Sequence, residues 1–148
     1  MTANTSPIYT LIPINTWAKV TAADTTADGT DADVQLIYTA DATDGGYVKK
    51  VVCHPQSASG SPTMSACSLR IYLNNGSAVG TAGNNLLIAE ISIPAGITVG
   101  VSASTAPVGM YIIPIEFQIQ AGYRLYGSAT AMAANTQWNM LAVAGDYS

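Results

Sequence analysis

The densest group of reactive side chains in this 148-residue chain is acidic. Six of its nine carboxylates fall between residues 24 and 44, a stretch that holds no lysine or arginine. Its centre, Asp28-Gly-Thr-Asp31-Ala-Asp33, alternates aspartates around a glycine, and calcium takes roughly six to eight oxygen ligands, some of them from such carboxylates. The spacing of an EF-hand, with its closing glutamate, is missing. We therefore expect a solvated acidic loop and no metal site, with Asp28, Asp31 and Asp33 as the candidates if a cation binds.

The other catalytic side-chain types occur without a recognisable partner. His54 is the single histidine, and the adjacent Cys53 would point to the opposite face of a strand. The two glutamates, Glu90 and Glu116, occupy outward positions of alternating segments, whereas a glycosidase needs two carboxylates about 5–9.5 Å apart. No Gly-x-Ser-x-Gly elbow or phosphate-binding loop occurs. We therefore expect a protein that is not an enzyme and that uses no cofactor.

The two cysteines, Cys53 and Cys67, fall on different predicted strands. A disulfide would need their Cα atoms within about 7 Å, which the spacing along the chain does not show. The N-terminus lacks the basic and apolar regions of a signal peptide, and no stretch approaches the ~20 apolar residues of a membrane helix. We therefore expect no membrane contact, and a reducing cytosol as the place of synthesis favours buried free thiols.

The segments that must position these residues read as strands. The clearest alternation lies at 67–74, where every second residue is apolar, as in a half-buried strand. The pair Lys49-Lys50 before Val51-Val52 breaks the alternation and indicates a bulge or a change of environment. Predicted strands cover 17–21, 34–40, 47–54, 67–74, 86–93, 110–120, 123–130 and 137–144, with a brief candidate at 97–101.

This pattern predicts an all-β fold, an antiparallel β-sandwich that is jelly-roll-like and has about eight strands. An immunoglobulin-like sandwich stays open as an alternative, although its Cys–Trp–Cys spacing is absent. Residues 1–15 are apolar and carry Pro7 and Pro13, and proline suits an edge strand better than a central one. We predict an extended N-terminal arm or edge strand over 1–15 and a single β-sandwich domain over 16–148.

The surface composition points to protein neighbours. Only 9% of the residues are charged, against about 25% in typical globular domains. Depletion of charge marks the cores of interfaces, so we predict a subunit of a symmetric assembly. The net charge of −4 offers no basic footprint for nucleic acid. Tyr72 and Tyr126 fall on polar faces of predicted strands, where we expect surface tyrosines, contacts between subunits or stacking on a sugar.

Five segments, in order, carry a resemblance to a known family. They are Gly-Gly-Tyr-Val-Lys-Lys-Val-Val (45–52), Leu-Arg-Ile-Tyr-Leu-Asn-Asn-Gly (69–76), Asn-Leu-Leu-Ile-Ala-Glu-Ile-Ser-Ile-Pro (85–94), Ala-Gly-Tyr-Arg-Leu-Tyr (121–126) and Ala-Gly-Asp-Tyr (144–147). Across 34–147 the chain resembles small virion structural proteins of tailed bacteriophages, of the capsid decoration or accessory type. The resemblance implies a β-sandwich that assembles on a capsid or tail as a trimer or larger ring, without catalytic residues.

The resulting hypothesis is a capsid decoration (cement) protein of the virion, made in the host cytoplasm. Its partners would be copies of itself and the major capsid protein or another virion protein. Burial of apolar surface by several subunits, at ~25 cal/mol/Å², would stabilise the head. Two alternatives remain: a tail, neck or host-recognition component of the virion, and a carbohydrate-binding β-sandwich module that uses surface tyrosines.

Overall fold

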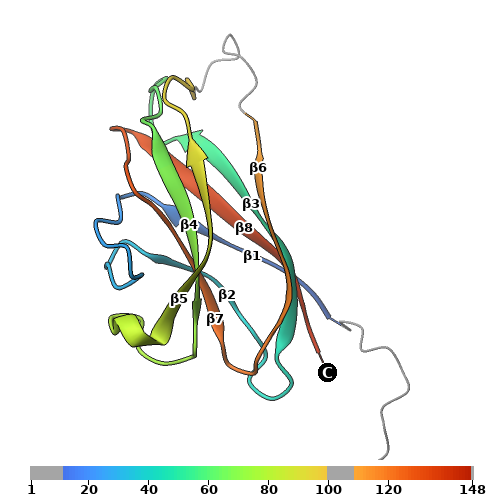
Figure 1. Ribbon diagram of the computed structural model, residues 1–148. Coiled ribbons are helices and arrows are strands. Elements are labelled where there is room, and N and C mark those ends of the chain that lie inside the picture. Colours follow the sequence, from blue (N-terminus) through green and yellow to red (C-terminus); the bar gives the residue numbers. More distant parts are fainter. Residues whose placement is uncertain (1–11, 100–108, 148) are drawn as a thin grey trace, which may run out of the picture.

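The structure is a computed structural model that describes residues 12–99 and 109–147. Within these residues the chain forms two antiparallel sheets of four strands each (Figure 1). Apart from the short 3-10 turn η1 (Ala82–Asn84), the regular elements in these ranges are all strands. They are β1 (Ile12–Val20), β2 (Gln35–Thr39), β3 (Gly46–Ser57), β4 (Cys67–Asn74), β5 (Asn85–Ile93), β6 (Tyr111–Ile119), β7 (Arg124–Ala129) and β8 (Thr136–Asp146). The predicted all-β sandwich of about eight strands is confirmed.

The strand order identifies the topology as a jelly roll. One sheet runs β1-β8-β3-β6 and the other runs β2-β7-β4-β5. The first strand therefore pairs with the last, β2 with β7, β3 with β6, and β4 with β5. This is one long antiparallel hairpin rolled into two layers, as in double-sheet jelly rolls. The pairs β3·β8 and β4·β7 then complete the two sheets.

Local sequence features explain several details of the strands. The register of β3 shifts between Val48 and Lys50 against both of its neighbours, so the bulge predicted at the lysine pair is confirmed. β1 begins at Ile12, earlier than the predicted 17–21, because an edge strand tolerates Pro13. The brief strand predicted at 97–101 is an isolated bridge between Thr63 and Thr98 as far as the structure describes it.

The structure describes only the last part of the arm or edge strand predicted over 1–15. Ile12 to Asn15 form the start of β1, which lies at the edge of its sheet and pairs with the end of β8. Residues 1–11 lie outside the described residues, so the arm itself stays a prediction.

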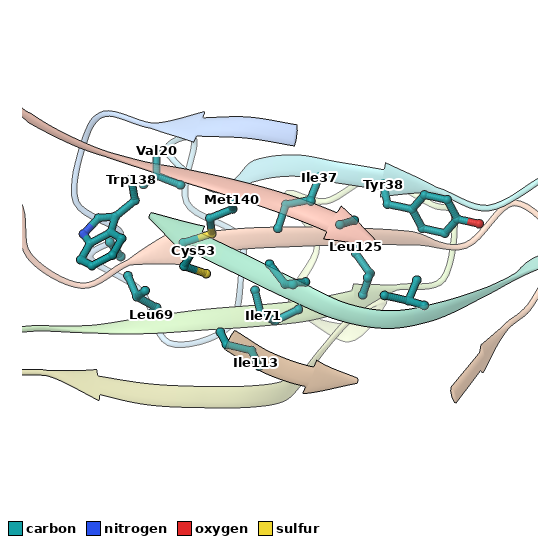
Figure 2. Close-up of a cluster of buried hydrophobic side chains, with 14 of the residues drawn as sticks. Val20, Ile37, Tyr38, Cys53, Leu69, Ile71, Ile113, Leu125, Trp138 and Met140 are labelled. Carbon is teal, nitrogen blue, oxygen red and sulfur yellow. The ribbon is translucent and has the colours of Figure 1, made fainter. Parts of the chain in front are cut away.

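The core lies between the two sheets, where inward side chains from both layers interdigitate (Figure 2). The largest fully buried side chains include Trp138 and Met140 from β8 and Leu69 and Ile71 from β4. Each buried aliphatic side chain of this kind stabilises the fold by about 1.5–3 kcal/mol. No helix among the described residues is long and apolar enough to span a membrane.

Polar bonds also join the two layers. The Tyr38 hydroxyl on β2 donates to the Asp146 carboxylate on β8 at 2.5 Å. The Thr16 hydroxyl on β1 donates to the Ile37 carbonyl on β2 at 2.6 Å. These bonds tie the β1–β8 side of one sheet to the β2 edge of the other.

Both cysteines are free thiols directed into the core. Burial raises the pKa of the Cys53 thiol to about 12, and it raises the pKa of the Cys67 thiol as well. A thiol that stays protonated at neutral pH is a poor nucleophile. The two cysteines therefore act as small apolar core residues.

Candidate functional site

The outer face of the β1-β8-β3-β6 sheet carries an unbroken apolar row across all four strands. The strand register places Trp17 beside Leu141, Leu141 beside Val52, and Val52 beside Ile112. This row is hereafter the apolar stripe. Trp17 is 67% exposed and Ile112 is 51% exposed. The solvent face of an antiparallel sheet is normally polar, so the stripe is a departure that calls for a partner.

The alternation of each strand explains why these residues point outward. In β3, Val51 and Cys53 are fully buried in the core. Val52, which stands between them, must then face away from the core. Met140 and Ala142 are likewise fully buried, and they direct Leu141 outward from β8. The stripe was not predicted from the sequence, although apolar runs such as Val51-Val52 and Met140-Leu141-Ala142-Val143 are typical of strands with two apolar faces.

A groove of about 480 Å³ runs along one side of the stripe. Its lining residues are Trp17, Lys19, Val52, His54, Gln56, Met110, Asn139 and Leu141. The Gln56 side-chain oxygen accepts hydrogen bonds from Gln137 at 2.8 Å and from Asn139 at 2.7 Å, which holds the polar end of the groove in place. Among the described residues that line the groove there is neither a carboxylate nor a thiol beside His54, so their arrangement suits binding of apolar side chains more than acid–base chemistry.

The stripe is flanked by positive charge. Lys19 shares the next row with Asn139 and His54. Lys50 occupies the row on the other side, beside Val143 and Pro114. The register places no carboxylate in these three rows, but the exposed Glu116 stands two residues from Pro114 on β6, at the register shift beside Lys50. A partner surface with an apolar centre and acidic groups around it would complement this face.

The middle of the outer face of the other sheet is covered by the chain itself. The loop of residues 21–34, between β1 and β2, folds over β4 and β7, where Asp24 is only 2% exposed. The Asp24 carboxylate accepts hydrogen bonds from the Ser128 hydroxyl at 2.7 Å and the Tyr72 hydroxyl at 3.2 Å. Its backbone N–H donates to the Ala129 carbonyl at 2.8 Å.

A second, smaller apolar cluster forms beneath this loop. It contains Val34, Tyr72 and Tyr126, with Val79 packed against it. Tyr72 is 1% exposed, and burial raises the pKa of its hydroxyl, with the Asp24 charge adding to the effect. The prediction that Tyr72 and Tyr126 lie on the surface is therefore wrong. A loop read as solvated covers them, so neither residue offers a face for a sugar.

The carboxylates of Asp28 and Asp31, two of the metal-ligand candidates, accept hydrogen bonds from residues of their own loop. Asp28 accepts hydrogen bonds from the Thr30 hydroxyl at 2.6 Å and the Thr30 N–H at 3.1 Å. Asp31 accepts from the Thr25 N–H at 2.9 Å, the Thr25 hydroxyl at 2.7 Å and the Asp33 N–H at 3.0 Å. These bonds hold the pKa values of Asp28 and Asp31 below their usual range. Within residues 12–99 and 109–147, no three His, Cys, Asp or Glu side chains are grouped to hold a metal ion.

The remaining residues singled out by the sequence do not converge. His54 is exposed beside the groove, while Cys53 points into the core behind it. Glu90 on β5 forms an ion pair with Arg70 at 2.6 Å. Glu116 lies on β6, in the other sheet. The structure therefore does not assemble these residues into one site.

Comparison with known proteins finds weak likeness. No family model matches the chain, and no curated protein matches it. Among solved structures, a chain of the infectious bursal disease virus Gt strain is 16% identical, with a TM-score of 0.26. The match covers 91% of this chain and 32% of the viral chain, so this chain spans under half of the length of its match. A TM-score this low supports no argument about fold or function.

Proposed function

We propose that the protein is a non-enzymatic virion structural protein, a capsid decoration protein that is held in a phage head by contacts between subunits. The observation that carries the proposal is the apolar stripe. Continuous exposed apolar patches on soluble proteins mark interaction surfaces, and Trp17 and Ile112 stand more than half exposed at its two ends. The opposite outer face, covered by residues 21–34, shows that this sandwich can bury outward aromatic residues within itself.

The assignment to a virion draws on two further observations. The chain resembles tailed-phage decoration proteins across residues 34–147. Its strand order is that of a jelly roll, a fold that recurs in viral capsids, although also in lectins and cupins. Because one fold hosts many functions, the fold alone does not decide the role. The resemblance and the exposed apolar stripe together support a virion role over that of a lectin or a cupin.

The stripe is built to bind without much ordering. Its residues alternate along each strand with core residues, as Val52 does with Val51 and Cys53. A surface held rigid by the core loses little conformational entropy when it docks. Each Å² of apolar area that it buries contributes ~25 cal/mol, and repetition over many copies would let a small protein reinforce a large shell.

The experiment is a binding measurement on purified phage heads that lack this protein. Full-length chain is added, heads are sedimented, and bound protein and the temperature of DNA release are measured. We expect wild-type protein to bind heads and raise the release temperature. Trp17→Ser should bind at least tenfold more weakly, whereas Leu36→Ser, which alters an exposed leucine on β2, should bind like the wild type.

Two results would contradict this proposal. Antibody labelling of intact particles that marks only tails would favour the tail or host-recognition alternative. Absence of the protein from purified particles, combined with glycan binding on an array, would favour a carbohydrate-binding module.

A further inference from the structure

We infer that the groove beside the apolar stripe binds an extended peptide segment of another virion protein, in which an apolar residue and an acidic residue stand two positions apart. The apolar side chain of that segment contacts Trp17, and its acidic side chain contacts Lys19. Its backbone bonds to the side-chain amides of Gln56 and Asn139. This inference rests on the proposed function, because it states the chemistry of the partner that the same face contacts.

The groove has the size and the lining to hold a short stretch of chain. Its volume of about 480 Å³ falls within the range of roughly 300–1,000 Å³ that is usual for ligand pockets. Trp17 on β1 and Met110, which directly precedes β6, border it from the two edges of the sheet, and both are about two-thirds exposed. Val52 and Leu141 line it from the central strands. The groove therefore offers an apolar floor between two exposed apolar side chains.

Two side-chain amides at the groove are held in a fixed orientation. The Gln56 side-chain oxygen accepts hydrogen bonds from Gln137 at 2.8 Å and from Asn139 at 2.7 Å. The Gln56 amide nitrogen is therefore turned away from these donors, and the Asn139 amide oxygen is turned away from Gln56. No hydrogen bond joins either of these two atoms to another residue that the structure describes. This donor and this acceptor match the carbonyl and the N–H that a peptide group carries.

The positive charge of Lys19 has no carboxylate near it. Apart from His54, the lining formed by the described residues holds no other titratable side chain. The nearest carboxylate along the chain, Asp24, is 2% exposed and is bonded to the other sheet. The sequence contains no charged residue in the segments that continue from this end of the sheet, which are 21–23, 55–66 and 131–137. An acidic side chain of a partner would therefore complement Lys19.

The second lysine of this face is placed differently. Lys50 lies beyond the stripe and does not line the groove. It has the exposed Glu116 nearby, at the register shift of β3 and β6. Glu116 follows Met110 by six positions, which is about 20 Å along an extended strand, so it does not reach the groove. Lys50 is therefore a matched control for Lys19.

The spacing of the groove residues determines the pattern of the segment that fits. Trp17 and Lys19 are separated by Ala18, which packs against the core, so both direct their side chains outward from β1. They stand about 7 Å apart along the strand. A peptide that lies extended beside β1 repeats this spacing, since it turns every second side chain toward the groove. An apolar residue and an acidic residue two positions apart therefore meet Trp17 and Lys19 together.

The alternative occupant is a saccharide stacked on Trp17. A sugar presents hydroxyl groups around its ring, and a hydroxyl that is buried without a hydrogen-bond partner is costly. Val52 and Leu141, which form the floor, offer no such partner. A neutral sugar would also leave the charge of Lys19 unmatched. The observations therefore favour a peptide.

The first experiment repeats the sedimentation assay on phage heads with two variants of the full chain. Lys19→Gln and Lys50→Gln remove the same charge from the same face, and circular dichroism checks that both are folded. We expect Lys19→Gln to bind heads at least fivefold more weakly than the wild type, because an acidic group of the partner loses its counter-charge. Lys50→Gln should bind within a factor of about two of the wild type.

The second experiment titrates a probe peptide, Gly-Ser-Leu-Thr-Glu-Ser-Gly capped at both ends, into nitrogen-15-labelled full-length chain. The nuclear magnetic resonance signals of the Trp17 indole N–H and of the Gln56 and Asn139 side-chain amides should shift. The same peptide with Gln in place of Glu should bind at least threefold more weakly to the wild type. The two peptides should bind equally to Lys19→Gln, because the charge that distinguishes them has been removed.

Three outcomes would overturn the inference. One is a Lys19→Gln chain that binds heads like the wild type while Trp17→Ser does not, since the stripe would then contact the head without the groove. In that case the proposed function stands, whereas a wild-type chain that does not bind heads would contradict the proposed function itself. The second is a probe peptide that shifts none of the three signals at millimolar concentration. The third is a titration in which cellohexaose or maltoheptaose shifts these signals and the peptide does not, which would assign the groove to a saccharide.

Discussion

Both outer faces of this sandwich carry aromatic side chains at outward positions, but these side chains are buried on one face and exposed on the other. On the β2-β7-β4-β5 sheet, Tyr72 is buried beneath the loop 21–34, which is anchored by Asp24. On the β1-β8-β3-β6 sheet, Trp17 stands in solvent within a row of apolar neighbours. The chain has the means to cover an outward aromatic residue and does so on one side only. The bare side is therefore best explained by a partner, since folding alone does not require its apolar residues.

The largest expected effect on stability comes from truncating a buried aromatic side chain on the covered face. Tyr72→Ala should lower the free energy of unfolding by about 3–5 kcal/mol, because it removes a fully buried aromatic ring and leaves a cavity under the loop. Urea denaturation followed by far-ultraviolet circular dichroism measures the change. A loss below about 1 kcal/mol would show that the loop does not pack on this face as described.

Removing the loop's anchor should have the next largest effect. Asp24→Ala should cost about 1–3 kcal/mol, because the buried hydroxyls of Tyr72 and Ser128 lose their shared acceptor. Asp44→Ala, at an exposed turn position, serves as the matched control and should change stability by at most about 0.5 kcal/mol. Equal losses for the two variants would contradict the anchoring role of Asp24.

Acid should loosen the covered face before it disturbs the sheets. Hydrogen bonds from Thr30 lower the pKa of Asp28, and those from Thr25 and Asp33 lower the pKa of Asp31, from the ordinary value of 3.8. A carboxylate whose pKa is lowered by folding stabilises the fold at pH values above its pKa in the unfolded chain. This contribution is lost as the pH falls through its pKa in the folded chain.

Hydrogen exchange, corrected for the intrinsic effect of pH, reads this change directly. Protection of the Thr25 and Thr30 amides should fall as the pH drops below about 4, while amides in β3 and β8 keep theirs. Loop amides that stay protected at pH 2 would show that the aspartate bonds do not hold the loop.

The smallest effect on stability is expected at the bare face. Trp17→Ser should change the free energy of unfolding by no more than about 0.5 kcal/mol, because an exposed side chain contributes little to the folded monomer. Measured by the same urea denaturation in dilute solution, it pairs with Tyr72→Ala as two aromatic residues on opposite outer faces. A loss of several kcal/mol would mean that Trp17 is part of the monomer's own packing.

The strands were readable from the sequence because their signal is local. The alternation of 67–74 gave β4 its observed bounds, and the lysine pair at 49–50 marked the bulge in β3. The small and acidic residues of the loop 21–34 look solvated, which holds for Asp28 but not for Asp24, whose burying contacts come from β4 and β7. The apolar stripe was missed for a related reason. It exists only after four separate strands are placed in register, which no local pattern encodes.

The most direct test of the account is whether Trp17 becomes buried when the protein assembles. The chain has two tryptophans, and Trp138 is buried already, so a change in acrylamide quenching of the fluorescence reports on Trp17, with Trp17→Phe as the blank. We predict that quenching falls and the emission shifts to shorter wavelength as the protein concentration rises or phage heads are added. Quenching that stays at the level of a free indole under both conditions would contradict the claim that this face binds another protein.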